Sequence, residues 1–120
     1  TGDIAVEIVA PDEAGLRAAG IDALRELLVG SSPVRALAER PIAPQGRDAA
    51  ERLVRFLEEA LYLYAAEQFV PRRAGPGGVL GEPFDPARHT ALREVKAVTY
   101  HAAAVRRDSA GLTATLVFDV

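Results

Sequence analysis

The fold is decided by the C-terminal stretch LTATLVFDV, residues 112–120, in which apolar side chains alternate with mostly polar ones. Such alternation is typical of a β-strand, whose side chains point in turn to its two faces. Residues 95–105 also have a strand pattern, and a turn is expected at 107–111 between the two segments. The sequence therefore predicts a β-hairpin at the end of the chain. The apolar face of its last strand consists of Leu112, Ala114, Leu116, Phe118 and Val120, and the other face of Thr113, Thr115, Val117 and Asp119.

One strand and two helices are predicted before this hairpin. Residues 3–10 alternate as a half-buried strand does, with Ile4, Val6 and Ile8 on its apolar face. Asp12 can cap a helix whose apolar residues recur at helical spacing until Gly30. Asp48 can cap a second amphipathic helix. The apolar stripe of this second helix consists of Leu53, Phe56, Leu57, Ala60, Leu61 and Tyr64.

The remaining segments have weaker patterns. Residues 34–43 indicate one strand or a pair of strands, and residues 68–70 the beginning of another. Residues 74–78 are rich in glycine and predict a flexible turn or loop. A phosphate-binding P-loop is not indicated there, because its Lys and Ser/Thr are missing and no helix follows. Together these elements predict an α+β fold, a two-layer sandwich with two main helices packed on a mixed or antiparallel sheet.

Composition limits the class of protein. A chain of 120 residues with 49% hydrophobic content is expected to form one domain, residues 1–120, with its own core. The absence of Cys excludes disulfides and thiolate chemistry. No apolar run is long enough for a membrane span, so we expect a cytoplasmic protein with no membrane partner. The net charge of −3 argues against bulk electrostatic binding of nucleic acid, and no DNA partner is expected.

Two aspartates stand at the ends of the outermost predicted strands in the sequence. Asp3 begins the first strand and Asp119 ends the last, each on the face opposite the bulkier apolar row. If these strands are antiparallel neighbours, the two carboxylates meet, and the α-carboxylate of Val120 joins them where Val120 is the chain terminus. Crowded carboxylate oxygens favour Ca²⁺ or Mg²⁺ over zinc. Spacing alone nevertheless favours the simpler interpretation, in which both aspartates are unconnected and face solvent.

Residues 81–89 predict a polar loop that contains secondary site candidates. Two prolines stiffen the backbone around Asp85, whose side chain can turn back to bond its own main chain. A histidine such as His89, beside Arg88, is more typical of a hydrogen-bonding loop residue than of a catalytic base. Lys96, predicted to lie in a strand, could reach a phosphate or an acidic partner, or could be an ordinary edge-strand lysine.

No nucleophile with a matched base emerges from the sequence. The serines lie in turns without a GxSxG context, and Cys is absent. A metal-dependent hydrolase that activates water through Asp3 and Asp119 stays open as an alternative. A general RNA-binding or chaperone-like module is another. A non-catalytic protein is the favoured interpretation.

Several motifs resemble those of the archease family. The match extends over most of the chain, and its C-terminal motifs are the most specific. They are GEPFDPARH at 81–89, EVKAVTYH at 94–101 and FDV at 118–120, with weaker matches of DIAV at 3–6, LYLY at 61–64, and Glu67 with FVP at 69–71.

The resemblance implies a partner protein for an RtcB-type RNA ligase. That ligase joins RNA ends bearing a 2′,3′-cyclic phosphate or a 3′-phosphate to 5′-hydroxyl ends, in tRNA splicing or RNA repair. Archeases promote guanylylation of a ligase histidine by GTP and so support multiple turnover, without being the catalyst. By resemblance, this chain is expected to be a non-catalytic activator that meets RNA only through the ligase.

The resemblance also implies a metal site, with calcium as the expected ion, at Asp3, Asp119 and Val120. These are the residues that the strand argument brings together. The chain departs from the family pattern in two places. The usual His-Thr-Ala-Asp motif is represented by Thr1-Gly2-Asp3, without the His in this sequence and with Gly2 where Ala is usual, and the segment 72–80 is short and rich in glycine.

Partner docking is the other expectation from the resemblance. We expect Asp85, Arg88, His89 and Lys96 to lie in or beside a surface that meets the ligase near its active site. Phosphoryl chemistry depends on positioning and on cations, which is what such a surface could help to arrange.

Overall fold

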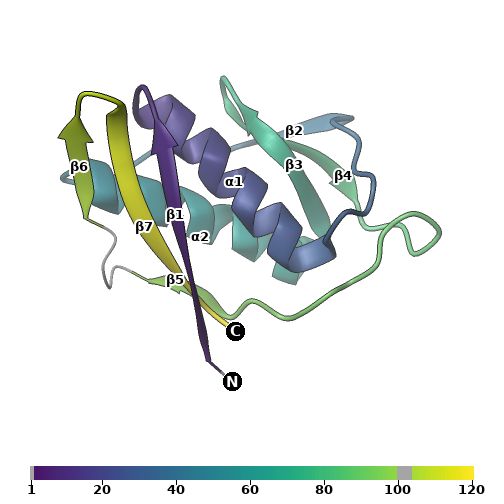
Figure 1. Ribbon diagram of the computed structural model, residues 1–120. Helices are drawn as coiled ribbons and strands as arrows, with labels where there is room; N and C mark the ends of the chain where they lie inside the picture. Colours follow the sequence, from purple (N-terminus) through teal and green to yellow (C-terminus); the bar gives the residue numbers. More distant parts are fainter. Residues whose placement is uncertain (1, 100–103) are drawn as a thin grey trace.

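The structure, a computed structural model, describes residues 2–99 and 104–120. Within these residues every strand pairing is antiparallel, which confirms the predicted α+β class. The strands are divided between two sheets (Figure 1). In chain order the elements are β1 (Asp3–Ala10), α1 (Glu13–Val29), β2 (Ala38–Pro41), α2 (Ala49–Glu67), β3 (Phe69–Gly75), β4 (Gly78–Pro83), β5 (Ala97–Thr99), β6 (Val105–Asp108) and β7 (Gly111–Asp119).

The first sheet is built around β7, the strand with the strict alternation. β1 pairs along one side of it in a continuous register from Asp3 opposite Asp119 to Ala10 opposite Leu112. β5 and β6 pair with β7 on its other side. The predicted apolar face of β7 is buried from Leu112 to Phe118, because it lies against the helices. The first and last strands are therefore antiparallel neighbours, as the metal-site argument required.

The second sheet has the order β2-β4-β3. The turn between β3 and β4 is confined to residues 76–77, so the predicted loop at 74–78 is too long. A side chain at Gly81 would clash with the Val70 carbonyl oxygen, so glycine permits the close approach of these strands. β4 also includes residues 81–83, which the sequence had assigned to the polar loop, and Glu82 within it is buried.

Both helices begin at the predicted caps. The Asp12 side chain accepts a hydrogen bond from the Gly15 N–H at 2.8 Å, and the Asp48 side chain accepts one from the Glu51 N–H at 2.8 Å. These contacts satisfy N–H groups that have no partner inside the first turn. α1 ends at Gly30, whose φ of 59° suits glycine.

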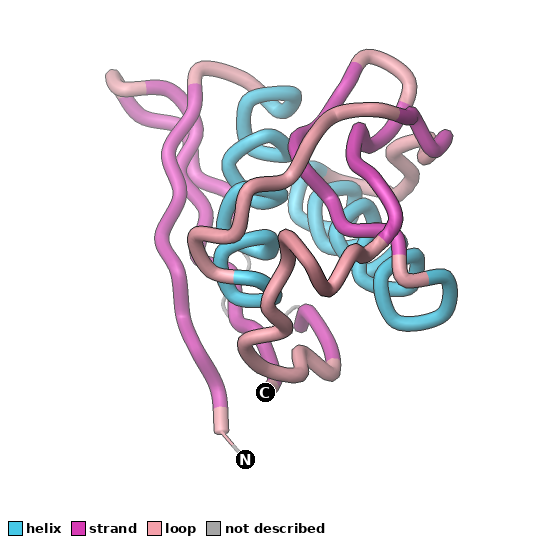
Figure 2. The backbone as a smooth tube through the Cα atoms, turned by 90° about the vertical axis from the view of Figure 1, so that its right-hand side faces the viewer, coloured by secondary structure: helices cyan, strands magenta, loops and turns pink. Residues whose placement is uncertain are grey.

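The core lies where the helices meet the two sheets. Figures 1 and 2 show α1 running between the strands of the first and second sheets, and α1 packs against β1, β3 and α2. No helix in the described part of the chain is long and apolar enough to cross a membrane. The largest fully buried apolar side chains are Phe118, Leu16, Ile21, Leu24, Leu28, Leu53, Leu57 and Leu116.

Three predicted segments have other boundaries in the structure. Of the two alternatives for residues 34–43, the single strand forms, as the shorter β2. The predicted strand over 95–105 contains the short β5 and the beginning of β6, while residues 100–103 lie outside the described part. The predicted turn at 107–111 is narrower, because β6 continues to Asp108. In each case pairing with a neighbouring strand, which the local pattern cannot reveal, sets the boundary.

Candidate metal centre and docking loop

The two aspartates singled out in the sequence are direct neighbours across β1 and β7. At the adjoining position the Gly2 N–H donates to Val120 O at 3.2 Å, and the Val120 N–H donates to Gly2 O at 2.9 Å. Hydrogen-bonded and non-hydrogen-bonded pairs alternate in an antiparallel ladder, so Asp3 and Asp119 form a non-hydrogen-bonded pair. Opposite Cα atoms in such a pair are about 4.5 Å apart, and the side chains are close. Two carboxylates thus meet on the outer face of the sheet.

Asp119 is supported from its other side by the chain around β5. The register pairs it with Ala97, and the Lys96 N–H donates to Asp119 O at 2.7 Å. Ala97 has only a methyl group beside the Asp119 side chain, which leaves this part of the face open. Lys96 precedes β5 and is exposed, so the prediction that it lies in a strand is wrong. Its main chain nevertheless borders the aspartate pair.

The donor set at this sheet end suits a hard cation. Asp3 is exposed and Asp119 is half-buried, so both carboxylates can be reached from solvent. Among residues 2–99 and 104–120, no group of three or more His, Cys, Asp or Glu side chains could hold a metal. Water, main-chain oxygens and, where Val120 is the chain terminus, its α-carboxylate could supply further ligands. Oxygen-only coordination completed by water is typical of Ca²⁺ or Mg²⁺ and not of structural zinc.

Sequence reasoning missed Glu82, whose carboxylate has more side-chain partners than any other in the described part of the chain. It is 1% exposed, although it carries a carboxylate. The Arg88 guanidinium donates to both of its oxygens, through Nη1 to Oε2 at 2.9 Å and through Nη2 to Oε1. The Arg35 main-chain N–H donates to Oε2 at 2.6 Å, and Arg35 Nε donates to Oε1 at 3.3 Å. A buried charge is tolerated only with partners of this kind.

His89 completes the cluster and fixes the loop. Its Nδ1 accepts the Asp85 N–H at 2.9 Å, so the proton lies on Nε2, which donates to Glu82 Oε2 at 3.1 Å. The Arg88 and His89 N–H groups both donate to Asp85 O, and the Asp85 side chain accepts the Ala87 N–H at 2.9 Å. The predicted bond of Asp85 to its own loop is therefore confirmed. His89 is 2% exposed, so its side chain stabilises the loop from within and does not reach the surface.

The electrostatic effect on Glu82 is large. The Arg88 guanidinium, assisted by the N–H groups of Arg35 and His89, holds the pKa of the Glu82 carboxyl far below its usual range despite burial. Glu82 is thus ionised throughout the neutral range. The cluster joins β4, the loop that follows it and the segment before β2. Arg35 in this last segment lies 47 positions from Glu82 in the sequence. The only cue in the sequence was the place of Glu82 within the family-like motif.

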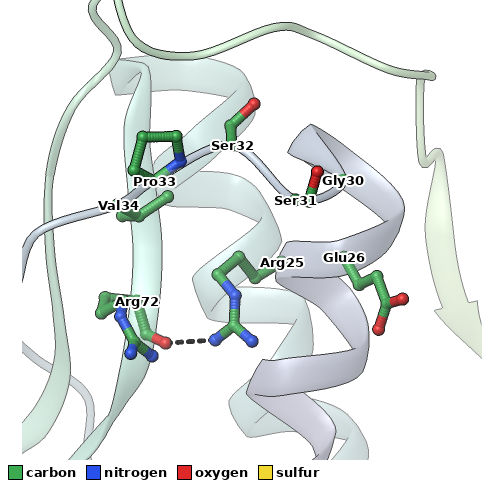
Figure 3. Close-up of a pocket in the computed structure, with 8 residues that line it drawn as sticks. All are labelled: Arg25, Glu26, Gly30, Ser31, Ser32, Pro33, Val34 and Arg72. Atoms are coloured by element: carbon green, nitrogen blue, oxygen red, sulfur yellow. Dashed lines mark hydrogen bonds between the residues drawn. The ribbon is translucent and has the colours of Figure 1, made fainter.

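A separate hollow of about 510 Å³ lies between the end of α1 and β3 (Figure 3). Arg25 and Arg72 line it, and Arg25 donates to Arg72 O. Arg25 also pairs with Asp22 at 2.9 Å, and Glu26 lies in the wall. The charges around the hollow therefore balance, and its walls contain no paired nucleophile and base.

The predicted site residues thus fall into two groups. Asp3, Asp119 and Val120 meet at one end of the first sheet, with Lys96 beside them. The other three, Asp85, Arg88 and His89, belong to the Glu82 cluster. Asp85 and Arg88 reach the surface, with side chains 45% and 26% exposed.

The fold and these residues define a class, a small α+β domain with two antiparallel sheets and a pair of carboxylates at one sheet end. The chain matches the Archease protein family over residues 1–120 and belongs to this family. It is 34% identical to the protein archease of Pyrococcus furiosus over 97 residues, covering 71% of this chain and 68% of that protein. It is 30% identical to the protein archease of Methanopyrus kandleri, covering 100% and 94% respectively.

A solved structure has the same fold. It is that of an archease from Thermotoga maritima, described as a possible chaperone. The TM-score is 0.67, and the match covers 98% of this chain and 90% of that one. At 20% sequence identity this likeness concerns the fold alone.

Proposed function

We propose that this protein activates an RtcB-type RNA ligase as a non-catalytic cofactor. In this proposal it promotes guanylylation of the ligase by GTP and so supports multiple turnover, in tRNA splicing or RNA repair. Asp3, Asp119 and Val120 would hold a divalent metal ion, with calcium as the first candidate. The observation that carries the proposal is the direct pairing of Asp3 with Asp119 on an accessible sheet face. Membership of the archease family supports it.

The aspartate pair is suited to this role because it is costly without a cation. Like charges directly opposite each other in a sheet are destabilising. A bound cation would offset that repulsion and supply positive charge near nucleotide phosphates. The main-chain bonds of Gly2 and Lys96 hold the two strands around Asp119, so the carboxylates are positioned before any ion arrives.

The expected docking residues, Asp85, Arg88, His89 and Lys96, would contribute to the contact with the ligase in two ways. Lys96 is exposed next to Asp119, where its ammonium group could contact a phosphate or a carboxylate of the ligase. Asp85 and Arg88 offer polar groups on the loop surface, and the buried His89 keeps that loop in shape. The partner would therefore meet Asp85, Arg88 and Lys96 directly, and His89 only through the loop.

The test is guanylylation of the cognate ligase with GTP, with and without this protein. Substoichiometric protein should raise the rate, and the effect should fall when a chelator removes divalent ions that the ligase itself does not need. Equal guanylylation in the presence and absence of the protein would contradict the proposal.

The same purified protein also tests the two alternative functions. Turnover of phosphoester or amide substrates without the ligase would indicate a metal-dependent hydrolase. Salt-sensitive binding of RNA, or protection of unrelated unfolded proteins, would indicate an RNA-binding or chaperone-like module.

A further inference from the structure

Glu82 brings together two arginines from distant parts of the chain. Arg35 lies between α1 and β2, and Arg88 lies in the loop after β4. Both guanidinium groups contact the same oxygen, Glu82 Oε1. Because Glu82 is buried and fixed, its carboxylate holds these two cations close together at the surface.

Burial of Glu82 does not require the Arg35 side chain. Arg88 already forms a two-bond pair with the carboxylate, and the Arg35 main chain supplies a further N–H. The Arg35 guanidinium adds one long contact through Nε and is 58% exposed. An ion pair so exposed contributes little to stability. Within the described residues its terminal nitrogens have no hydrogen-bond acceptor, so they can donate to another molecule.

A hollow beside Arg88 offers room for an acceptor. It measures about 400 Å³ and is lined in part by Ser31, Ser32, Arg88 and Thr90. Ser32 Oγ accepts the Thr90 N–H at 3.0 Å, and within the described residues its own proton has no acceptor. The hollow therefore presents hydroxyl and guanidinium donors, the groups that bind a carboxylate.

We propose that Arg35 and Arg88 form a docking surface for an acidic side chain of the partner protein, which enters the hollow beside Arg88. Glu82 is the positioning residue of this surface. The inference rests on the proposed function, since the ligase is the partner. Glu82 and Asp85 offset the charges of Arg35 and Arg88, so no net positive charge is left to attract a polyanion such as a nucleic acid. A single protein carboxylate is favoured because it can be bound by the directed N–H donors of the two guanidinium groups. The net charge of −3 acts in the same direction.

The test is a titration of the full-length protein into the ligase guanylylation assay with the variant Arg35→Gln. The concentration for half-maximal stimulation should rise about tenfold, the loss typical of an interface arginine, and the maximal rate should stay the same. The thermal midpoint should not move, because Arg35 is exposed. The matched control is Arg47→Gln, which removes an arginine with a side chain 91% exposed and paired with Glu51; it should change nothing.

A second variant, Arg88→Lys, keeps the charge and loses the two-bond geometry. This variant should also raise the concentration for half-maximal stimulation. Added salt should reduce the difference in that concentration between the variant and the wild type. If the wild type stimulates the ligase and both variants match it across the titration, the docking surface is refuted and the proposed function survives. If the wild type gives no stimulation, both fall.

Discussion

Replacing Glu82 with Gln removes one charge from the interior and changes the volume little. The carboxylate accepts hydrogen bonds at both oxygens, whereas a Gln amide has one acceptor. With its oxygen in the place of Oε2, Gln can keep the contacts to Arg88 Nη1, the Arg35 N–H and His89 Nε2. Its amide NH₂ group then faces Arg88 Nη2 and Arg35 Nε, which are donors themselves.

The magnitude follows mainly from the lost contact with Arg88, because the long Nε contact of the exposed Arg35 side chain contributes little. A hydrogen bond to a charged group contributes about 1.5–3 kcal/mol, and the Arg88 donor is left facing another donor, so we expect a loss of about 3 kcal/mol in the free energy of unfolding. Partial exposure of both arginines allows some rehydration and keeps the loss below that of a fully enclosed pair. For a domain of this size, about 3 kcal/mol lowers the thermal midpoint by about 10 °C.

The assay is urea unfolding at neutral pH and in acid. The lowered pKa of Glu82 means that its contribution is complete above the pKa of an unfolded Glu, about 4.3, and is lost as the pH falls below it. The difference between Glu82→Gln and the wild type should therefore shrink between pH 5 and pH 3. A loss under about 1 kcal/mol at pH 7, or a difference that stays constant into acid, would refute the account of the cluster.

Three further changes test the fold. Asp48→Ala removes the α2 cap and should cost about 1 kcal/mol with an unchanged denaturant slope in urea. Gly81→Ala places a Cβ against Val70 O and should cost about 2 kcal/mol or more, whereas Gly2→Ala, with nothing within 4 Å, should be nearly neutral; thermal melts of the pair compare them directly. Leu57→Ala opens a cavity at a side chain that is 0% exposed and should cost about 2–5 kcal/mol by urea unfolding, and a smaller loss would place this residue outside the core.

Local chemistry explains why much of the fold could be predicted. The caps at Asp12 and Asp48 and the alternation of residues 3–10 and 112–120 are encoded within a few neighbouring residues. They fixed both helices and the two longest strands of the first sheet. The pairing of Asp3 with Asp119 followed from these strands once they were taken as antiparallel neighbours.

The Glu82 cluster could not be predicted because one partner is remote in the chain and the nearer two, Arg88 and His89, meet Glu82 only where the loop folds back on β4. Arg35 donates to Glu82 across 47 positions, and no periodicity connects them. A Glu beside Pro83 in a polar motif suggests a solvent-facing loop, yet pairing of β4 with β3 carries it inward. The short strands were misjudged for a similar reason: β5 exists because β7 offers it a partner, and its own sequence is only AVT.

The most direct test of the central claim compares three carboxylates on the outer face of β1 and β7 in the stimulated guanylylation of the ligase. Asp3→Asn and Asp119→Asn should abolish stimulation and the binding of calcium while leaving the thermal midpoint of the metal-free protein unchanged or raised. The control Glu7→Gln alters a carboxylate on the same strand, opposite Thr115, and should stimulate as the wild type does. Full stimulation by both aspartate variants would contradict the account.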